Sequence, residues 1–111
     1  MSEQLAPLSI AISPRVRPVL ESMAGETPDQ KITILLLNEL RRNLEACDKE
    51  LLDFEVKYGL EHADFARKLA AGKLGNEFGY DLEMDAMRWQ GLITERKHWH
   101  KQLSQLRGST A

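Results

Sequence analysis

The residues best suited to chemistry in this chain are one cysteine and three histidines. Cys47 lies in a row of apolar residues without a catalytic neighbourhood, which is typical of a core thiol. His98 and His100 are two residues apart, so on a helix they point about 200° away from each other and cannot share a metal ion. His62 has no ligand partner at zinc-like spacing. We therefore predict no catalytic residue, no metal site and no cofactor.

The acidic residues that follow Cys47 are best explained as the solvated face of a helix. They are Asp48, Glu50, Asp53 and Glu55. The sequence also contains no glycine-rich phosphate loop and no nucleophile elbow. We therefore expect a protein that binds other macromolecules and is not an enzyme.

The composition is that of an ordinary globular protein, with 42% hydrophobic and 29% charged residues in 111. A net charge of −2, from 15 basic and 17 acidic residues, gives no global attraction to nucleic acid, so any DNA contact requires a local basic patch. The longest apolar run, Ile34 to Leu37, is too short to cross a bilayer, and the N-terminus lacks a signal-peptide pattern. A single cysteine suits a reducing compartment. These features predict a soluble cytoplasmic protein without a membrane partner.

The clearest local signals predict a long helix. Thr27 can cap its N-terminus, Pro28 suits the first helical position, and Gln30 can complete a capping box. No Gly or Pro interrupts the chain from there to Tyr58. Apolar residues recur at alternating steps of three and four, which is typical of a helix-packing seam. They are Leu37, Leu40, Leu44, Cys47, Leu51, Phe54 and Tyr58. Such a helix would be about 45 Å long, so we expect it to project and to pack along a partner helix.

Two further helices are predicted downstream of Gly59. The first runs from Glu61 to Ala71, and a turn-rich loop over residues 72–79 follows it. The last runs from about Asp81 to Leu106, with Gly91 in its middle, which either weakens the helix or permits a close approach. One side of this helix carries Trp89, Leu92, Trp99, Leu103 and Leu106, and the other carries Arg88, Arg96, Lys97 and Lys101.

Near the N-terminus, Leu8 to Ser13 alternates large apolar residues with small ones, which predicts a half-buried strand. No second strand is predicted elsewhere, and a lone strand cannot satisfy its backbone hydrogen bonds. The simplest partner is the same strand of another copy of the chain. The alternative is an extended N-terminal arm on a helical hairpin.

A short helix is predicted to follow this segment. Its apolar residues at helical spacing are Val16, Val19, Leu20 and Met23. It can begin at Pro14 with Ser13 as its cap, or at Pro18 after Arg17. Gly25 fits its C-terminal end.

The order of the predicted elements resembles that of the ribbon-helix-helix family: a strand, a short helix, a tight connection and a long helix. The matching residues are Leu8 to Ser13, then Val16, Val19, Leu20, Met23 and Ala24, then Thr27 to Leu44. The resemblance implies a mostly α fold, with a ribbon-helix-helix homodimerisation domain over residues 1–45 and a C-terminal helical arm over residues 46–111. The residues that it implies for dimerisation are Leu8, Ile10, Ile12, Val19, Leu36, Leu37 and Leu40.

The same resemblance implies contacts to DNA. The family reads the major groove with the outward side chains of its ribbon, which here are Pro7, Ser9 and Ala11. The residues that it implies near the phosphates are Arg15, Arg17, Thr27 and Lys31. Of the three ribbon residues only Ser9 can hydrogen-bond to a base edge. The expected binding to operator DNA is therefore weak.

A second resemblance concerns the C-terminal part. Three segments resemble a helical region of small prokaryotic proteins that are encoded beside toxin genes. They are Tyr58-Gly59-Leu60 through Phe65, then Gly72-Lys73-Leu74-Gly75, then Trp89 followed by a charged helix. This resemblance implies an antitoxin-like regulator of a toxin–antitoxin pair, which neutralises its toxin by protein–protein binding. The residues that it implies for partner binding are Trp89, Leu92, Arg96, Trp99 and Leu103.

Two alternatives to this interpretation follow from the residues. The last helix can instead fold back onto the seam, which would bury both tryptophans inside the protein. The chain can also be a helical adaptor or scaffold that does not bind DNA and self-assembles through its long helices. The first thirteen residues discriminate these functions. Pairing of Leu8 to Ser13 across a two-fold axis favours the regulator, and disorder of that segment favours the adaptor.

Overall fold

The computed structural model describes residues 6–75 and 81–108. Four helices occupy this part of the chain: α1 (Arg17–Glu21), α2 (Pro28–Tyr58), α3 (His62–Ala70) and α4 (Asp81–Leu106). Among these described residues there is no strand, so the fold is all-α. None of the described helices combines the length and the apolar character needed to cross a membrane.

The chain divides into two compact units, residues 1–36 and 37–111, and the boundary falls within α2. We call the first the N-terminal unit and the second the hairpin unit. The N-terminal unit contains α1 and the first turns of α2. The hairpin unit contains the remainder of α2 together with α3 and α4.

The bounds of α2 follow from local signals, as predicted. The backbone N–H of Gln30 donates to Thr27 Oγ1 at 3.1 Å, and the Gln30 side chain accepts from the N–H of Glu26 at 2.9 Å. These two bonds satisfy donors at the helix N-terminus that have no intrahelical acceptor. At the other end, Gly59 adopts a φ of 66°, a conformation that favours glycine and ends the helix after Tyr58.

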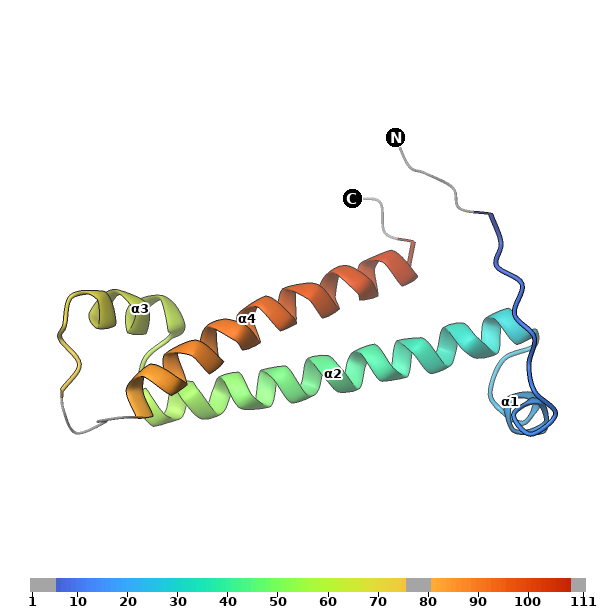
Figure 1. Cartoon of the computed structure of the whole chain (residues 1–111), viewed down its shortest axis with the longest axis horizontal. Helices are drawn as coiled ribbons and strands as arrows, with labels where there is room; N and C mark the ends of the chain where they lie inside the picture. Colours follow the sequence, from blue (N-terminus) through green and yellow to red (C-terminus); the bar gives the residue numbers. More distant parts are fainter. Residues whose placement is uncertain (1–5, 76–80, 109–111) are drawn as a thin grey trace. The chain divides into compact units, whose positions relative to one another are not determined.

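The hairpin unit is built by α4, which runs back along α2 in the antiparallel direction (Figure 1). Every residue of the predicted seam on α2 is buried or half-buried, and Leu44 and Cys47 are the most buried. From α4 the buried residues are Trp89, Leu92 and Leu103. The partner helix expected for the seam is therefore α4 of the same chain.

The helix α3 lies at one end of the hairpin (Figure 1). At this end an aromatic cluster packs α2, α3 and α4 together. Trp89 of α4 stacks on Phe54 of α2, with ring centroids 5.4 Å apart, and its centroid lies 4.7 Å from that of Phe65 in α3. Tyr58 packs against Phe65 at 4.8 Å. Trp89 and Phe65 are each only 1% exposed. We call these four residues the aromatic corner, and it joins three helices through one core.

The predicted strand over Leu8 to Ser13 was wrong, and with it the ribbon-helix-helix fold. Residues 6–13 have no regular secondary structure, and the described residues offer no second strand with which a ladder could form. Alternating apolar residues supply a face to bury but no hydrogen-bond partner. The first backbone bonds are those of Val16 and Arg17 N–H to the Ser13 carbonyl, both at 3.0 Å.

The short helix α1 follows the later of the two predicted starts. It begins at Arg17, with Pro18 in its first turn, after a turn over residues 14–16. It ends at Glu21, and the Ser22 hydroxyl donates to the Val19 carbonyl at 2.6 Å.

Gly91 provides a test of the helix interior. A Cβ added there would meet no atom within 4 Å, so Gly91 does not serve a close approach and only weakens α4. We expect Gly91→Ala to raise the free energy of unfolding by about 0.5–1 kcal/mol, measured by urea or thermal denaturation. Gly59→Ala is the control. Its open surroundings match those of Gly91, but its φ of 66° should make the alanine destabilising. A loss of stability in Gly91→Ala would contradict this account of α4.

Candidate functional site

The residues predicted to read DNA bases are not arranged to enter a groove. Pro7, Ser9 and Ala11 are exposed in the irregular N-terminal segment, where no strand or helix holds them in one direction. Arg15 makes no hydrogen bond or ion pair with the described residues, and Arg17 pairs with Glu21 at 2.8 Å. Without a ribbon, this segment presents no ordered reading surface to the major groove.

Lys31 and Thr27, both predicted near phosphates, are engaged within the N-terminal unit. The Lys31 ammonium group donates to the carbonyls of Glu21, Met23 and Gly25 at 3.1, 2.6 and 2.8 Å. An ammonium group has three donors, so this arrangement uses all of them. Thr27 caps α2 through its hydroxyl oxygen. Lys31 therefore holds the connection between α1 and α2 and has no donor left for a phosphate.

Removal of the Lys31 ammonium group tests this role. We expect Lys31→Met to destabilise the segment of residues 22–27 by about 1 kcal/mol, because charge-assisted hydrogen bonds are lost at a solvent-accessible site. Faster amide hydrogen exchange confined to this segment would measure it. Arg15→Met is the matched control, since Arg15 makes no such contact, and equal effects of the two substitutions would refute the role.

The predicted dimerisation residues give the N-terminal unit an apolar surface. Leu8 is 83% exposed and Ile10 is 63% exposed, whereas Leu37 and Leu40 are half-buried in the hairpin unit. No residue from 6 to 36 is buried. The large apolar residues exposed in this unit are Leu8, Ile10, Ile12, Val16, Val19, Met23, Leu35 and Leu36. We call these eight residues the N-terminal apolar surface.

The residues predicted to bind a partner lie mostly inside the hairpin unit. Trp89 and Leu92 are each 1% exposed and Leu103 is 8% exposed. Trp99 is half-buried, with the His98 ring at its edge, and Arg96 pairs with Asp48. Of the two alternatives for the tryptophans, the structure shows the one in which α4 folds back, which leaves Trp89 and Leu92 no exposed surface for a partner.

Ion pairs join the two long helices across the hairpin. Arg88 binds Glu50 through two nitrogens, both at 2.7 Å, and Arg96 binds Asp48 at 2.6 Å. The hydrogen bonds from Arg88 lower the pKa of Glu50. The sequence pattern predicts only a solvated face for Asp48 and Glu50, so these ion pairs were not predicted. The signal was the acidic excess of α2 and the basic excess of α4 from Met87 onward, and the alignment of the two depends on the hairpin register.

Cys47 is a core thiol. It is 4% exposed, and its sulfur lies 3.5 Å from Glu95 Oε2, to which the thiol donates. Burial, together with the hydrogen bond and negative charge of Glu95, raises the pKa of Cys47. The thiol therefore stays protonated at neutral pH, and a protonated buried sulfur is a poor nucleophile.

A cluster of three polar side chains, Lys57, Tyr58 and Asp85, lies beside the aromatic corner. One carboxylate oxygen of Asp85 accepts from the Tyr58 hydroxyl at 2.6 Å and from the Lys57 ammonium group. Burial raises the pKa of Asp85, but the hydrogen bonds from Lys57 and Tyr58 outweigh it, and the net pKa is lowered. Burial and the bond to Asp85 raise the pKa of Tyr58. This group fixes the start of α4 to the end of α2.

The lowered pKa of Asp85 predicts an acid-sensitive contribution to stability. Because the carboxylate is favoured in the folded state, the contribution is complete above the ordinary pKa near 4 and is lost as the pH falls through the lower folded pKa. Asp85→Asn should lower stability at pH 7 and flatten its decline between about pH 5 and 3, as measured by urea denaturation. Asp53→Asn, on the outer face of α2, is the control, and an unchanged acid decline in Asp85→Asn would contradict the assignment.

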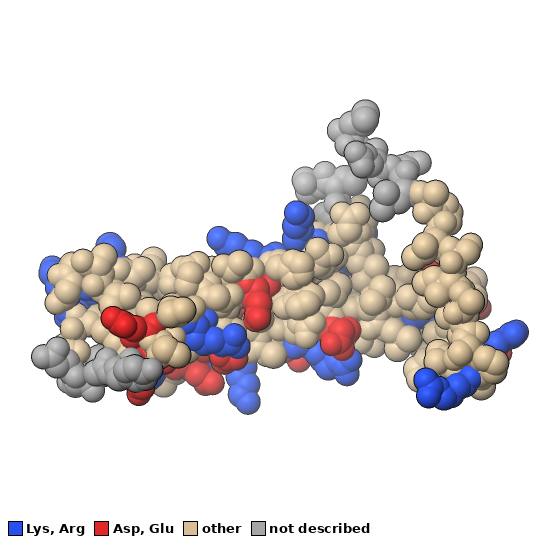
Figure 2. Space-filling view, viewed as in Figure 1, with Lys and Arg blue, Asp and Glu red and all other residues tan. Residues whose placement is uncertain are grey.

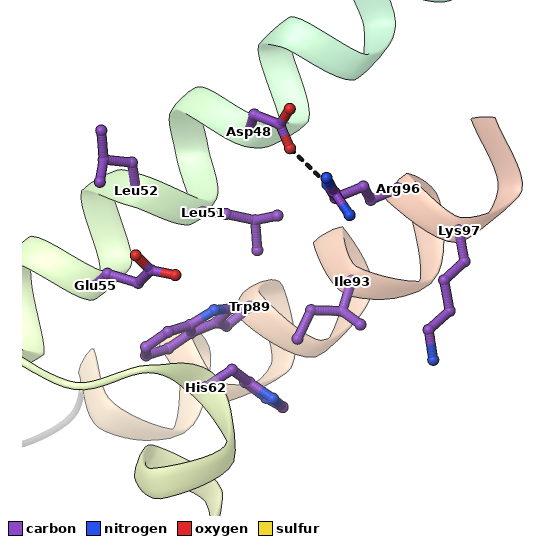
Figure 3. Close-up of a pocket in the computed structure, with 9 residues that line it drawn as sticks. All are labelled: Asp48, Leu51, Leu52, Glu55, His62, Trp89, Ile93, Arg96 and Lys97. Carbon is purple, nitrogen blue, oxygen red and sulfur yellow. Dashed lines mark hydrogen bonds and ion pairs between the residues drawn. The ribbon is translucent and has the colours of Figure 1, made fainter. Parts of the chain in front are cut away.

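The hairpin unit also has an open groove of about 530 Å³ between α2 and α4, beside the start of α3 (Figure 3). Its lining residues are Asp48, Leu51, Leu52, Glu55, His62, Trp89, Ile93, Arg96 and Lys97. Within residues 6–75 and 81–108, no three His, Cys, Asp or Glu side chains lie together as metal ligands would. The apolar lining residues form the floor of the groove, and the charged ones form its walls.

Comparison of the chain with known protein families, with curated proteins and with solved structures gives no match. On the face drawn in Figure 2, basic and acidic side chains are interspersed over the hairpin unit and do not form one broad basic region. Among the described residues, the N-terminal apolar surface and the groove are the two surfaces that we consider as binding sites.

Proposed function

We propose that this protein is a non-catalytic helical adaptor that self-associates through its N-terminal apolar surface. The observation that carries the proposal is a contrast between the two units. All six buried apolar residues among the described ones belong to the hairpin unit. Among residues 6–36 eight large apolar residues are exposed and none is buried. Apolar exposure on this scale, with no buried apolar residue beneath it, is typical of an interaction surface.

The area supports an interface of ordinary size. From their exposed fractions, the eight residues present roughly 700 Å² per chain, close to the ~800 Å² that each partner buries in a standard stable interface. Burial of such a surface at ~25 cal/mol per Å² is the driving force that homodimers commonly use. The polar contacts of Lys31 and Thr27 fix the chain but bury no apolar area, so they do not replace that force.

A second copy of the chain is the partner that this surface favours. Residues 6–36 carry three basic and three acidic side chains, so this stretch has no net side-chain charge. Two copies can therefore approach without like-charge repulsion. A two-fold arrangement places the same surface on both sides of the interface, so one apolar surface covers the other.

The toxin-binding function stays a prediction. Several residues on which the antitoxin resemblance rests, Tyr58, Phe65 and Trp89, belong to the aromatic corner. Their packing accounts for a shared helical region without reference to a shared partner. The adaptor proposal depends instead on surfaces that are exposed in this structure.

The oligomeric state tests the proposal. We expect the full chain to have twice the mass of one chain at tens of micromolar in analytical ultracentrifugation. The double variant Ile10→Asp and Val19→Asp should be monomeric, because two charges on each side would be buried in the interface. Both positions are more than half exposed in the single chain, at 63% and 56%, so the variant should keep its helices.

Val56→Asp is the matched control. Val56 is 75% exposed but lies in the hairpin unit, so this variant should associate like the unmodified chain. Circular dichroism confirms that each variant remains helical. A monomeric unmodified chain would refute the proposal, and so would association that survives both N-terminal substitutions.

A further inference from the structure

The groove of the hairpin unit has an apolar floor that is only partly covered. Leu51 from α2 and Trp89 and Ile93 from α4 lie between the two helices, and His62 at the start of α3 lies at one end (Figure 3). Leu52 adds an apolar side chain that is 57% exposed. The helix α3 has only nine residues and reaches the groove only with its first residue, His62. The remainder of the groove lies between α2 and α4. This is the space in which a third helix would complete a three-helix bundle.

The charges that line the groove are arranged along its length. Asp48 and Arg96 neutralise each other across it. Glu55 on α2 and Lys97 on α4 form no ion pair with the described residues. Glu55 follows Phe54, which stacks on Trp89, and Lys97 lies eight residues beyond Trp89, about 12 Å further along α4. One end of the groove is therefore acidic and the other is basic.

We propose that this groove binds an amphipathic helix of a partner protein, with an acidic turn at Lys97 and a basic turn near Glu55. A separation of about 12 Å corresponds to two helical turns, so one short helix can reach both charges. Acidic residues at the N-terminus of a helix and basic residues at its C-terminus also suit the helix dipole. The bound helix therefore runs from Lys97 toward His62, with its apolar stripe on Leu51, Leu52 and Ile93.

Recognition of this kind is a helix-in-groove interaction. It is independent of self-association, because the groove residues belong to the hairpin unit and the N-terminal apolar surface does not. The monomeric variant Ile10→Asp and Val19→Asp should bind the helix as well as the unmodified chain. The two proposals can therefore fail separately.

The probe is a synthetic amphipathic peptide of about 12 residues, with a leucine stripe, glutamates in its first turn and lysines in its last, so that the two charged turns lie about 12 Å apart. This length is at the short end of marginal helix formation. Titration of the isotope-labelled full chain should shift the NMR signals of the Leu51, Leu52 and Ile93 methyl groups. We expect Leu52→Ser to weaken the peptide about tenfold. Val56→Ser, one turn further along α2 and outside the groove, should change the affinity less than about twofold.

The charges are tested by a second pair of variants. Lys97→Glu should weaken the peptide about tenfold, and a peptide with lysines in place of its first-turn glutamates should recover the affinity. Lys101→Glu, one turn further along α4 and outside the groove lining, should have little effect. Absence of saturable shifts up to about 1 mM peptide would overturn the proposal. Equal losses in Leu52→Ser and Val56→Ser, or shifts confined to residues 6–36, would overturn it as well.

Discussion

Burial of the Trp89 indole is the interaction on which the hairpin unit depends. One side chain from α4 contacts Phe54 of α2 and Phe65 of α3, so a single core fixes three helices. With nine residues, α3 is too short to be stable alone, because isolated helices of this length do not compensate the cost of nucleation. Its order derives from Phe65, which fills the aromatic corner. The turn at Gly59 directs α3 toward the aromatic corner, and packing in that corner then stabilises α3.

The same packing sets the register in which charges meet. Once Trp89 stacks on Phe54, Arg88 lies beside Glu50, Arg96 beside Asp48 and Glu95 beside Cys47. The arginine pairs are solvent-exposed, and exposed pairs contribute little free energy each. Their effect is on specificity, because a shift of α4 by one turn would separate all of them. Apolar burial thus supplies the stability, and the charges select one register.

Sequence reasoning recovered the elements whose limits are encoded locally. Thr27 and Pro28 start α2, Gly59 ends it, and the heptad spacing identified the face that is buried. The aromatic corner and the ion pairs were not predicted, because their contacts between α2 and α4 join residues about 30 to 50 positions apart, and the register of the two helices is not a local property. The strand over residues 8–13 failed for a related reason. Alternating apolar residues indicate which side of a strand could be buried. A strand also requires a neighbouring strand whose backbone donates and accepts hydrogen bonds.

The two units differ in what stabilises them, and this difference separates their roles. The hairpin unit buries its apolar residues internally, so its stability belongs to the single chain. The N-terminal unit is held by the Lys31 and Thr27 hydrogen bonds and leaves its apolar residues outside. Stability gained by covering them depends on chain concentration, as mass action requires. The helix α2 is continuous from Pro28 to Tyr58, and the hairpin unit already stabilises its later turns. Ordering of its first turns therefore extends an existing helix and does not require a new nucleation step. Association therefore needs to order few residues, and more of the energy of apolar burial remains available as affinity.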